Sequence, residues 1–248
     1  MKEKIISTIQ ELIAAIEIDH GDYEGSVWYR GHAEKEWSLK PGYLRLTKFI
    51  SESTLVKRFK QSAVMLTEKD PKDNFDWLFL MQHHGVPTRL LDWTESPLVA
   101  LYFALCNQES HPDKDAVVWS LRPSELNKNA SIFDANEEFF IHSFEDEELV
   151  NYKVETLASN PRLKQLPVAS IATRNNSRIQ AQLGVLTIHH LDNKGIEEIG
   201  DQSHVMKYII PSDRRVIIYK QLSLLGFSKF TMFPELSSIG ENIKKGCS

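Results

Sequence analysis

Apolar positions recur at two spacings along the chain, one typical of helices and the other of strands. Near the start, Ile5, Ile9, Leu12 and Ile16 follow the helical period and predict a helix that ends before Gly21. The other helices are predicted over residues 54–66, 74–83 and 212–225, and from Pro97, which suits the first helical position and follows two candidate caps, Thr94 and Ser96.

Runs rich in β-branched and aromatic residues predict the strands. These lie at residues 26–31, 88–93, 116–121, 168–172, 184–190 and 205–210. Strands and helices are interspersed without a regular βαβ alternation or a glycine-rich phosphate loop, and no linker or repeat divides the chain. The pattern therefore predicts an α+β fold in which residues 1–248 form a single domain, with a mixed, twisted sheet flanked by helices.

Composition and charge then limit the classes of function. The chain has 248 residues, and its net charge of -5 lacks the basic character of a dedicated duplex binder. Cys106 and Cys247 offer neither a metal spacing nor a disulfide framework, which favours a reducing, cytoplasmic compartment. The longest apolar run, residues 98–106, is far shorter than the roughly 20 residues that span a bilayer. We therefore expect no metal centre and no membrane partner.

The densest group of polar side chains is the run from Gln82 to Thr94, which surrounds a glycine-proline turn and a short apolar strand. Amides, imidazoles, a guanidinium and a carboxylate are costly to hold beside a core unless they bind something, so the run predicts a site. His83 and His84 are adjacent on a helix and point about 100° apart, which disfavours a metal. His84 is nevertheless a candidate general base or ribose contact.

The charged residues of this region also have structural interpretations. Arg30, at the end of a predicted strand, would pair with a buried carboxylate such as Asp92. Asp92 itself is expected to be buried, where it would cap the helix at Pro97 or pair with Arg89.

Five motifs are spread over roughly residues 1–245. They are Tyr29-Arg30-Gly31, Leu39-Lys40-Pro41 with Arg45, the run from Gln82 to Thr94, Arg178-Ile179 with Ala181-Gln182 and Gly184, and Phe233-Pro234-Glu235-Leu236. In this order they resemble the successive signatures of FRG domains, a family found in bacterial and phage proteins. The central run is the most specific of the five, whereas the triplet alone would be weak.

The layout is also similar, more distantly, to that of ADP-ribosyltransferases. In both, a strand ends in aromatic-Arg-Gly, and a later strand with hydroxyl residues leads into an Ala-x-x-Phe helix. This resemblance implies that Arg30 binds the diphosphate or ribose of NAD and that Gly31 lets the backbone approach the ligand. It also implies that Thr94, with Asp92, lines the nicotinamide side.

The late segment departs from that layout. Transferases of this type often carry Glu there, whereas this chain reads Gln180-Ala181-Gln182. An amide can orient a ribose hydroxyl but cannot remove a proton. Either Asp92 or a histidine then supplies the charge, or the site binds a nucleotide without turning it over. The structural alternative for Arg178 and Gln182, four apart on a helical face, is a surface hydrogen bond.

The sequence thus predicts a nucleotide site in which Arg30, Asp92 and Gln182 line one concavity. The catalytic candidates are Arg30, His84, Asp92, Thr94 and Gln182, and the NAD-binding candidates are Tyr29, Arg30, Gly31, Gln82, Arg89 and Arg178. The preferred function is an ADP-ribosyltransferase-like toxin or phage-defence effector that uses NAD as substrate and modifies a protein or nucleic acid. The alternative is a non-catalytic nucleotide-binding or protein-interaction module. A nuclease is disfavoured because the sequence contains no carboxylate cluster suited to Mg²⁺.

Overall fold

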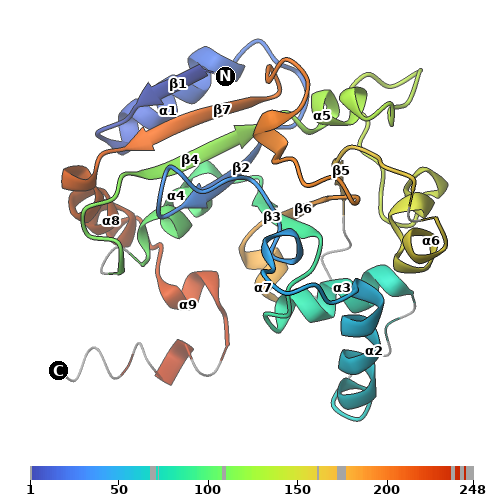
Figure 1. The fold of residues 1–248 in the computed structure, drawn as a ribbon. Coiled ribbons are helices and arrows are strands. Elements are labelled where there is room, and N and C mark those ends of the chain that lie inside the picture. Colours follow the sequence, from blue (N-terminus) through green and yellow to red (C-terminus); the bar gives the residue numbers. More distant parts are fainter. Residues whose placement is uncertain are drawn as a thin grey trace.

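The computed structural model describes residues 2–67, 71, 73–107, 110–160, 162–171, 177–235, 238–240 and 243. In this part of the chain a single seven-stranded sheet has the order β1-β7-β4-β2-β3-β6-β5 (Figure 1). The strands are β1 (Lys2–Ile5), β2 (Trp28–His32), β3 (Leu90–Thr94), β4 (Ala116–Leu121), β5 (Val168–Ser170), β6 (Gly184–Ile188) and β7 (Val205–Ile210). β1 and β7 are parallel, and the other neighbours are antiparallel. The predicted mixed sheet is confirmed.

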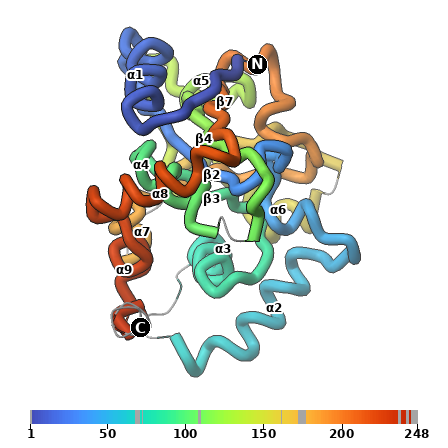
Figure 2. Tube along the Cα trace, turned by 90° about the vertical axis from the view of Figure 1, so that its left-hand side faces the viewer, coloured from blue at the N-terminus to red at the C-terminus, as the bar shows by residue number. Residues whose placement is uncertain are grey.

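Helices cover both faces of the sheet. They are α1 (Ile9–His20), α2 (Glu52–Ala63), α3 (Asn74–His83), α4 (Pro97–Leu105), α5 (Pro123–Asn129), α6 (Val154–Ser159), α7 (Ser177–Ala181), α8 (Arg215–Leu224) and α9 (Lys229–Met232). α1, α4 and α8 share one apolar cluster, whereas α5 and the 3-10 turn at Ile196–Glu198 belong to the cluster around Trp93 and Trp119. A third cluster joins α2, α3 and α6, and α2 lies at the opposite end of the molecule from α1 (Figure 2).

Several predicted elements are confirmed, together with the local signals that bound them. α3 spans the predicted residues 74–83, and α4 begins at Pro97 after Ser96, whose hydroxyl accepts a hydrogen bond from Val99 N at 3.3 Å. Gly226 ends α8 with a φ of +87°, a conformation that L side chains rarely adopt.

Two predictions at the ends of the chain are wrong in detail. Residues 2–5 form the edge strand β1 rather than the start of a helix, and α1 begins at Ile9 after its cap Thr8. Pairing with β7, about 200 positions later, decides this, and no local periodicity reveals it. The predicted helix 212–225 begins as a 3-10 turn at Ser212–Arg214, and α8 follows it.

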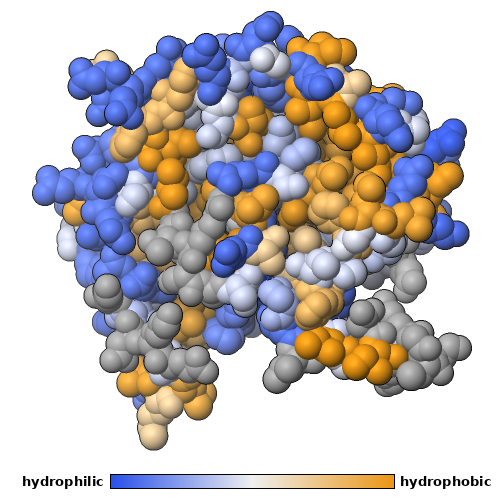
Figure 3. All heavy atoms as spheres, turned by 180° about the vertical axis from the view of Figure 1, so that it is seen from behind, coloured by the Kyte–Doolittle hydropathy of each residue, from blue (hydrophilic) through white to orange (hydrophobic). Residues whose placement is uncertain are grey.

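Exposed apolar side chains gather just beyond α2, at the tip seen at the lower left of Figure 3. Val64, Met65 and Leu66 are 56%, 95% and 84% exposed there. Among the described helices none is both long and apolar enough to cross a membrane.

Gly31 of β2 allows α4 to cross the sheet at backbone contact. A Cβ at this position would lie 1.9 Å from the carbonyl oxygen of Ala100 and 2.5 Å from the amide nitrogen of Ala104. Both atoms belong to the helix backbone, so the helix itself would have to move. Gly31 was expected to let a ligand approach the backbone, and in the structure it lets α4 approach. Gly31 also lines the cavity described below.

We expect Gly31→Ala to destabilise the protein by about 3 kcal/mol, because overpacking against the backbone cannot relax by side-chain rotation. In a chain of this length the melting temperature should fall by about 6–12 °C. Thermal unfolding measures this, with Gly42→Ala as the control, because its Cβ would meet Pro87 at an ordinary 3.5 Å. Equal melting temperatures for the two variants would contradict the close helix crossing.

Candidate functional site

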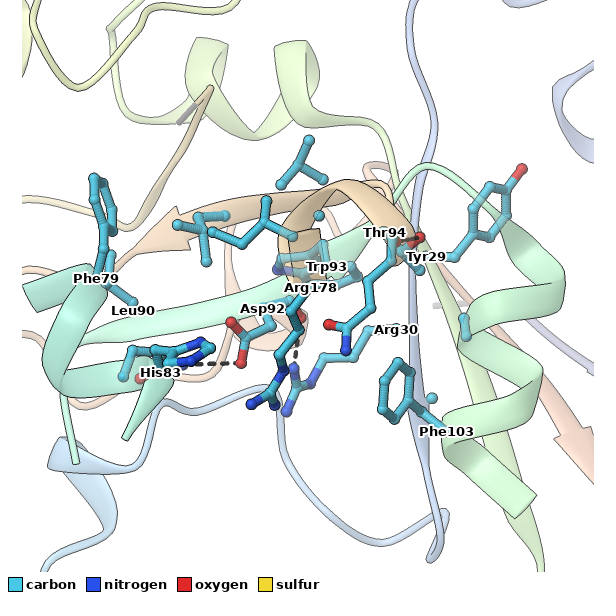
Figure 4. Close-up of a pocket in the computed structure, with 18 of the residues that line it drawn as sticks. Tyr29, Arg30, Phe79, His83, Leu90, Asp92, Trp93, Thr94, Phe103 and Arg178 are labelled. Atoms are coloured by element: carbon cyan, nitrogen blue, oxygen red, sulfur yellow. Dashed lines mark hydrogen bonds between the residues drawn. The ribbon is translucent and has the colours of Figure 1, made fainter. Parts of the chain in front are cut away.

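The predicted polar segments meet at a cavity of about 290 Å³ (Figure 4). Its walls come from β2, α3, β3, α4, α7 and β6. Arg30, Asp92 and Gln182 all line it, so the predicted concavity is confirmed. Aromatic and aliphatic side chains share the wall with charged, amide and hydroxyl side chains, so the cavity offers a small molecule both apolar contacts and hydrogen-bonding groups.

The cavity adjoins the point where β2 and β3 separate. Among the described residues the two strands pair only at Tyr29 and Thr94. Continuing that register would place Gly31 opposite Asp92, but no pair forms there. Instead, Nη1 of Arg30 donates to the Asp92 carbonyl. The Arg30 side chain therefore connects β2 and β3 where their backbones no longer pair.

The Arg30 guanidinium is only partly committed by its surroundings. Nε donates to Nε2 of His32 at 2.9 Å, and Nδ1 of His32 lies 3.2 Å from the Trp37 carbonyl. Burial, and then the charge of Arg30, lower the pKa of His32 to about 3, so the imidazole is neutral and Nε2 can accept. Nη2 of Arg30 has no hydrogen-bond partner among the described residues. It is the donor available to a ligand.

Asp92 is exposed to the cavity rather than buried as predicted, and it is the only acidic residue among the described residues that line it. Nε2 of Gln82 donates to Asp92 Oδ2 at 2.9 Å, and Thr88 Oγ1 donates to Gln82 Oε1 at 2.5 Å. This chain of hydrogen bonds orients both the amide and the carboxylate. The two structural roles predicted for Asp92, capping α4 and pairing with Arg89, are wrong, because Ser96 caps α4 and Arg89 pairs with Glu52.

Thr94 and Gln182 line the cavity, but their polar groups are largely used by the fold. The Thr94 hydroxyl donates to the Gln182 carbonyl at 2.6 Å, and Nε2 of Gln182 donates to the Met232 carbonyl at 2.9 Å. These bonds fasten the turn after α7 to β3 and to α9. A positioning role fits both residues better than proton transfer.

Arg178 enters the same cavity from α7, as Figure 4 shows beside Arg30. Its guanidinium carbon lies 4.6 Å from the Phe233 ring centroid, and Phe233 meets Phe103 edge-on. The surface hydrogen bond proposed for Arg178 and Gln182 is found only between their backbones, where Gln182 N donates to the Arg178 carbonyl at 3.0 Å.

The histidine that lines the cavity is His83, not the predicted His84. His84 is exposed at the end of α3, against Phe59. Burial lowers the pKa of His83, and the charge of Arg178 lowers it further. The signal was present in the helical spacing, because Phe79, Gln82 and His83 stand at i, i+3 and i+4 and share one face.

Arg89 does not belong to the cavity. Its side chain is fully buried, and it donates to Glu52 Oε2 at 2.7 Å, to the His189 carbonyl at 2.5 Å and to the Tyr152 carbonyl at 2.6 Å. The NAD-binding role predicted for Arg89 is not supported by this placement. Tyr29, by contrast, does line the cavity, and burial raises the pKa of its phenol to about 12.

The fold and the site together define a mixed α/β protein with one sheet and a ligand-sized cavity where two strands part. Residues 25–113 match the family model of the FRG domain, the family that the sequence motifs resemble. The match includes β2, α2, α3, β3 and α4, but not the late segments around Gln182 and Phe233. No curated protein and no solved structure matches the chain.

Proposed function

We propose that the cavity binds NAD and that the protein is an ADP-ribosyltransferase-like enzyme with a macromolecular acceptor. The observation that carries the proposal is the arrangement of Arg30 and Asp92. A guanidinium with an uncommitted N–H lies beside the one acidic residue among the described lining residues, and a hydrogen-bond chain orients that carboxylate. The Arg30 guanidinium suits a phosphate or a ribose hydroxyl, and the Asp92 carboxylate suits a positive charge that develops on the ribose.

In this reaction the bond between ribose C1′ and the nicotinamide nitrogen breaks, and its electron pair leaves with nicotinamide. The carboxylate of Asp92 stabilises the positive ribose that develops. An acceptor nucleophile then forms a bond to C1′ and loses a proton. His83 is the imidazole in the cavity wall, and its lowered pKa keeps it neutral and able to take that proton.

A non-catalytic nucleotide-binding module is the second candidate. The late segment favours it, because Gln182 offers an amide whose nitrogen is already bonded to the Met232 carbonyl. Incubation with labelled NAD and a bacterial lysate separates the two. Label in protein, RNA or DNA supports the transferase, and NAD binding without nicotinamide release supports the module. A toxin or phage-defence role predicts growth arrest on expression of the active protein.

Arg30→Lys tests the guanidinium itself. We expect NAD affinity to fall by about 10- to 100-fold, because a bidentate fork becomes a point charge, while the protein remains folded. Calorimetric titration with NAD and thermal unfolding measure the two effects. Arg58→Lys is the control, since Arg58 is exposed on α2 and does not line the cavity. A large loss of melting temperature with unchanged affinity would show that Arg30 is structural.

A further inference from the structure

A second, smaller hollow of about 150 Å³ adjoins the cavity. Four lining residues belong to both spaces: Arg30, Gly31, Phe103 and Asn107. The remaining wall comes largely from the segment after β2, which contributes Trp37, Ser38, Lys40 and Arg45, together with His111. Because Arg30 stands in the shared wall, one ligand can contact both spaces at its guanidinium.

The second hollow is positively charged. Three of its described lining residues are cations, Arg30, Lys40 and Arg45. No Asp or Glu is found among the described residues that line it. Arg45 is exposed and has no ion-pair partner among the described residues. Lys40 meets Glu198 only loosely, at 3.7 Å. Lys40 also interacts with the Glu197 carboxylate, so Arg45 is the charge of this wall that lacks a counter-charge within the described structure.

Arg45 is also close enough to Arg30 for their positive charges to repel each other. The charge of Arg45 acts with burial to lower the pKa of Arg30, and it acts on His32 in the same direction. The carboxylate that opposes this effect at Arg30 is Asp92, which stands on the cavity side. An anion in the hollow would relieve the repulsion, whereas a cation or an apolar group would not.

Neutral donors complete the wall. Ser38 contributes a hydroxyl and Asn107 an amide, and both residue types commonly bind phosphate oxygens. His111 belongs to an ion pair with Glu34 at 2.7 Å, which offsets its charge when protonated. The hollow thus combines guanidinium, ammonium and neutral donors, the set that recognises phosphate groups.

We propose that this hollow, formed by Arg30, Lys40 and Arg45, is the subsite for the diphosphate of a nucleotide whose ribosyl end occupies the larger cavity. The assignment rests on the proposed function, because a nucleotide is the ligand that spans both spaces. It gives Lys40 and Arg45 a role in binding rather than in chemistry. Arg30 lies at the junction, between the diphosphate and the reacting ribose.

Inorganic pyrophosphate is the direct probe of this subsite. Calorimetric titration at constant ionic strength, without divalent cations, should detect binding to the wild type. Lys40→Gln and Arg45→Gln should each weaken it by about tenfold or more, since each removes a charge-assisted contact. Lys57→Gln and Arg58→Gln are matched controls, because they remove the same charges from exposed positions of α2 that line neither space. Both controls should bind as the wild type does.

The outcomes separate this inference from the proposed function. No pyrophosphate binding by the wild type, or equal affinities in the variants and their controls, overturns the subsite even if NAD is turned over. Binding that is lost in Lys40→Gln and Arg45→Gln supports the subsite even if NAD is not cleaved. ADP should displace pyrophosphate, and a short single-stranded oligonucleotide that displaces it more strongly than ADP overturns the assignment to a nucleotide.

Discussion

Asp92→Asn is expected to lower the rate of nicotinamide release at least about 100-fold while NAD binding changes little. The carboxylate contributes most when positive charge develops on the ribose, so its loss raises the barrier more than it weakens the bound substrate. The fold should survive. Asparagine keeps an oxygen that can accept from Gln82 Nε2, and position 92 is exposed to the cavity.

The assay measures nicotinamide release and NAD affinity for wild type and variant, with the acceptor present. Asp213→Asn is the matched control, because that carboxylate is 70% exposed and its ion pair within the described part of the chain is a surface contact with Arg214. Gln182→Ala should act more mildly than Asp92→Asn, since its amide positions the turn after α7. Full activity in Asp92→Asn would remove Asp92 from the mechanism.

Acid should destabilise the protein steeply, beginning near pH 6.5. Four buried histidines have their pKa lowered to about 3 or 4, and in each of them burial is the largest cause and a nearby arginine adds to it. The pKa falls to about 4 for His20 beside Arg122, about 3 for His32 beside Arg30, and about 3 and about 4 for His189 and His190 beside Arg89. Each of these imidazoles is therefore neutral in the folded protein at neutral pH.

The sign follows from the protons bound in each state. Between pH 6.5 and the lowered values, the unfolded chain binds protons that the folded protein excludes, so stability falls as the pH falls. In this window each histidine lowers the free energy of unfolding by up to about 1.4 kcal/mol for each unit by which the pH falls. Together the four histidines lower it by several kcal/mol by pH 5. Above pH 7 this contribution should be constant.

Urea unfolding at intervals from pH 8 to pH 5 measures this slope. His20→Gln should flatten it, because glutamine can still bond to Ser120 but does not titrate. His84→Gln serves as the control, since that ring is exposed at the end of α3. A slope that is the same in wild type and His20→Gln would mean that His20 is not held neutral by the fold.

Local sequence signals were sufficient for much of the fold but not for the assignment of the arginines. The apolar run and caps of α3 and α4 depend on neighbours within a few residues, so their bounds could be predicted. Arg30 lies within β2 and Arg89 directly precedes β3, and nothing in the neighbouring sequence distinguishes their roles. Their difference arises from Glu52 and the His189 carbonyl, which surround Arg89 only after folding.

The sequence contained enough information to choose His83 over His84 as the histidine of the cavity wall. The helical period alone places His83 on the same face of α3 as Phe79, which lines the cavity. The exposure of Asp92 depends instead on the separation of β2 and β3. Strand pairing of that kind is a tertiary property. The sequence therefore identified the segments that build the cavity better than the orientation of each side chain within it.

The parallel pairing of β1 with β7 has a consequence for how the protein is made. The apolar stripe of α1, including Ile9 and Leu12, packs in a cluster with residues of β7 and α8, which lie about 200 positions later. At the usual 5–20 residues per second, a ribosome needs roughly 10–40 s to synthesise that interval. Until then the stripe has no partner from those elements, and it is open to chaperones. β1, which precedes the other six strands of the sheet in chain order, is therefore among the last to be fixed in it.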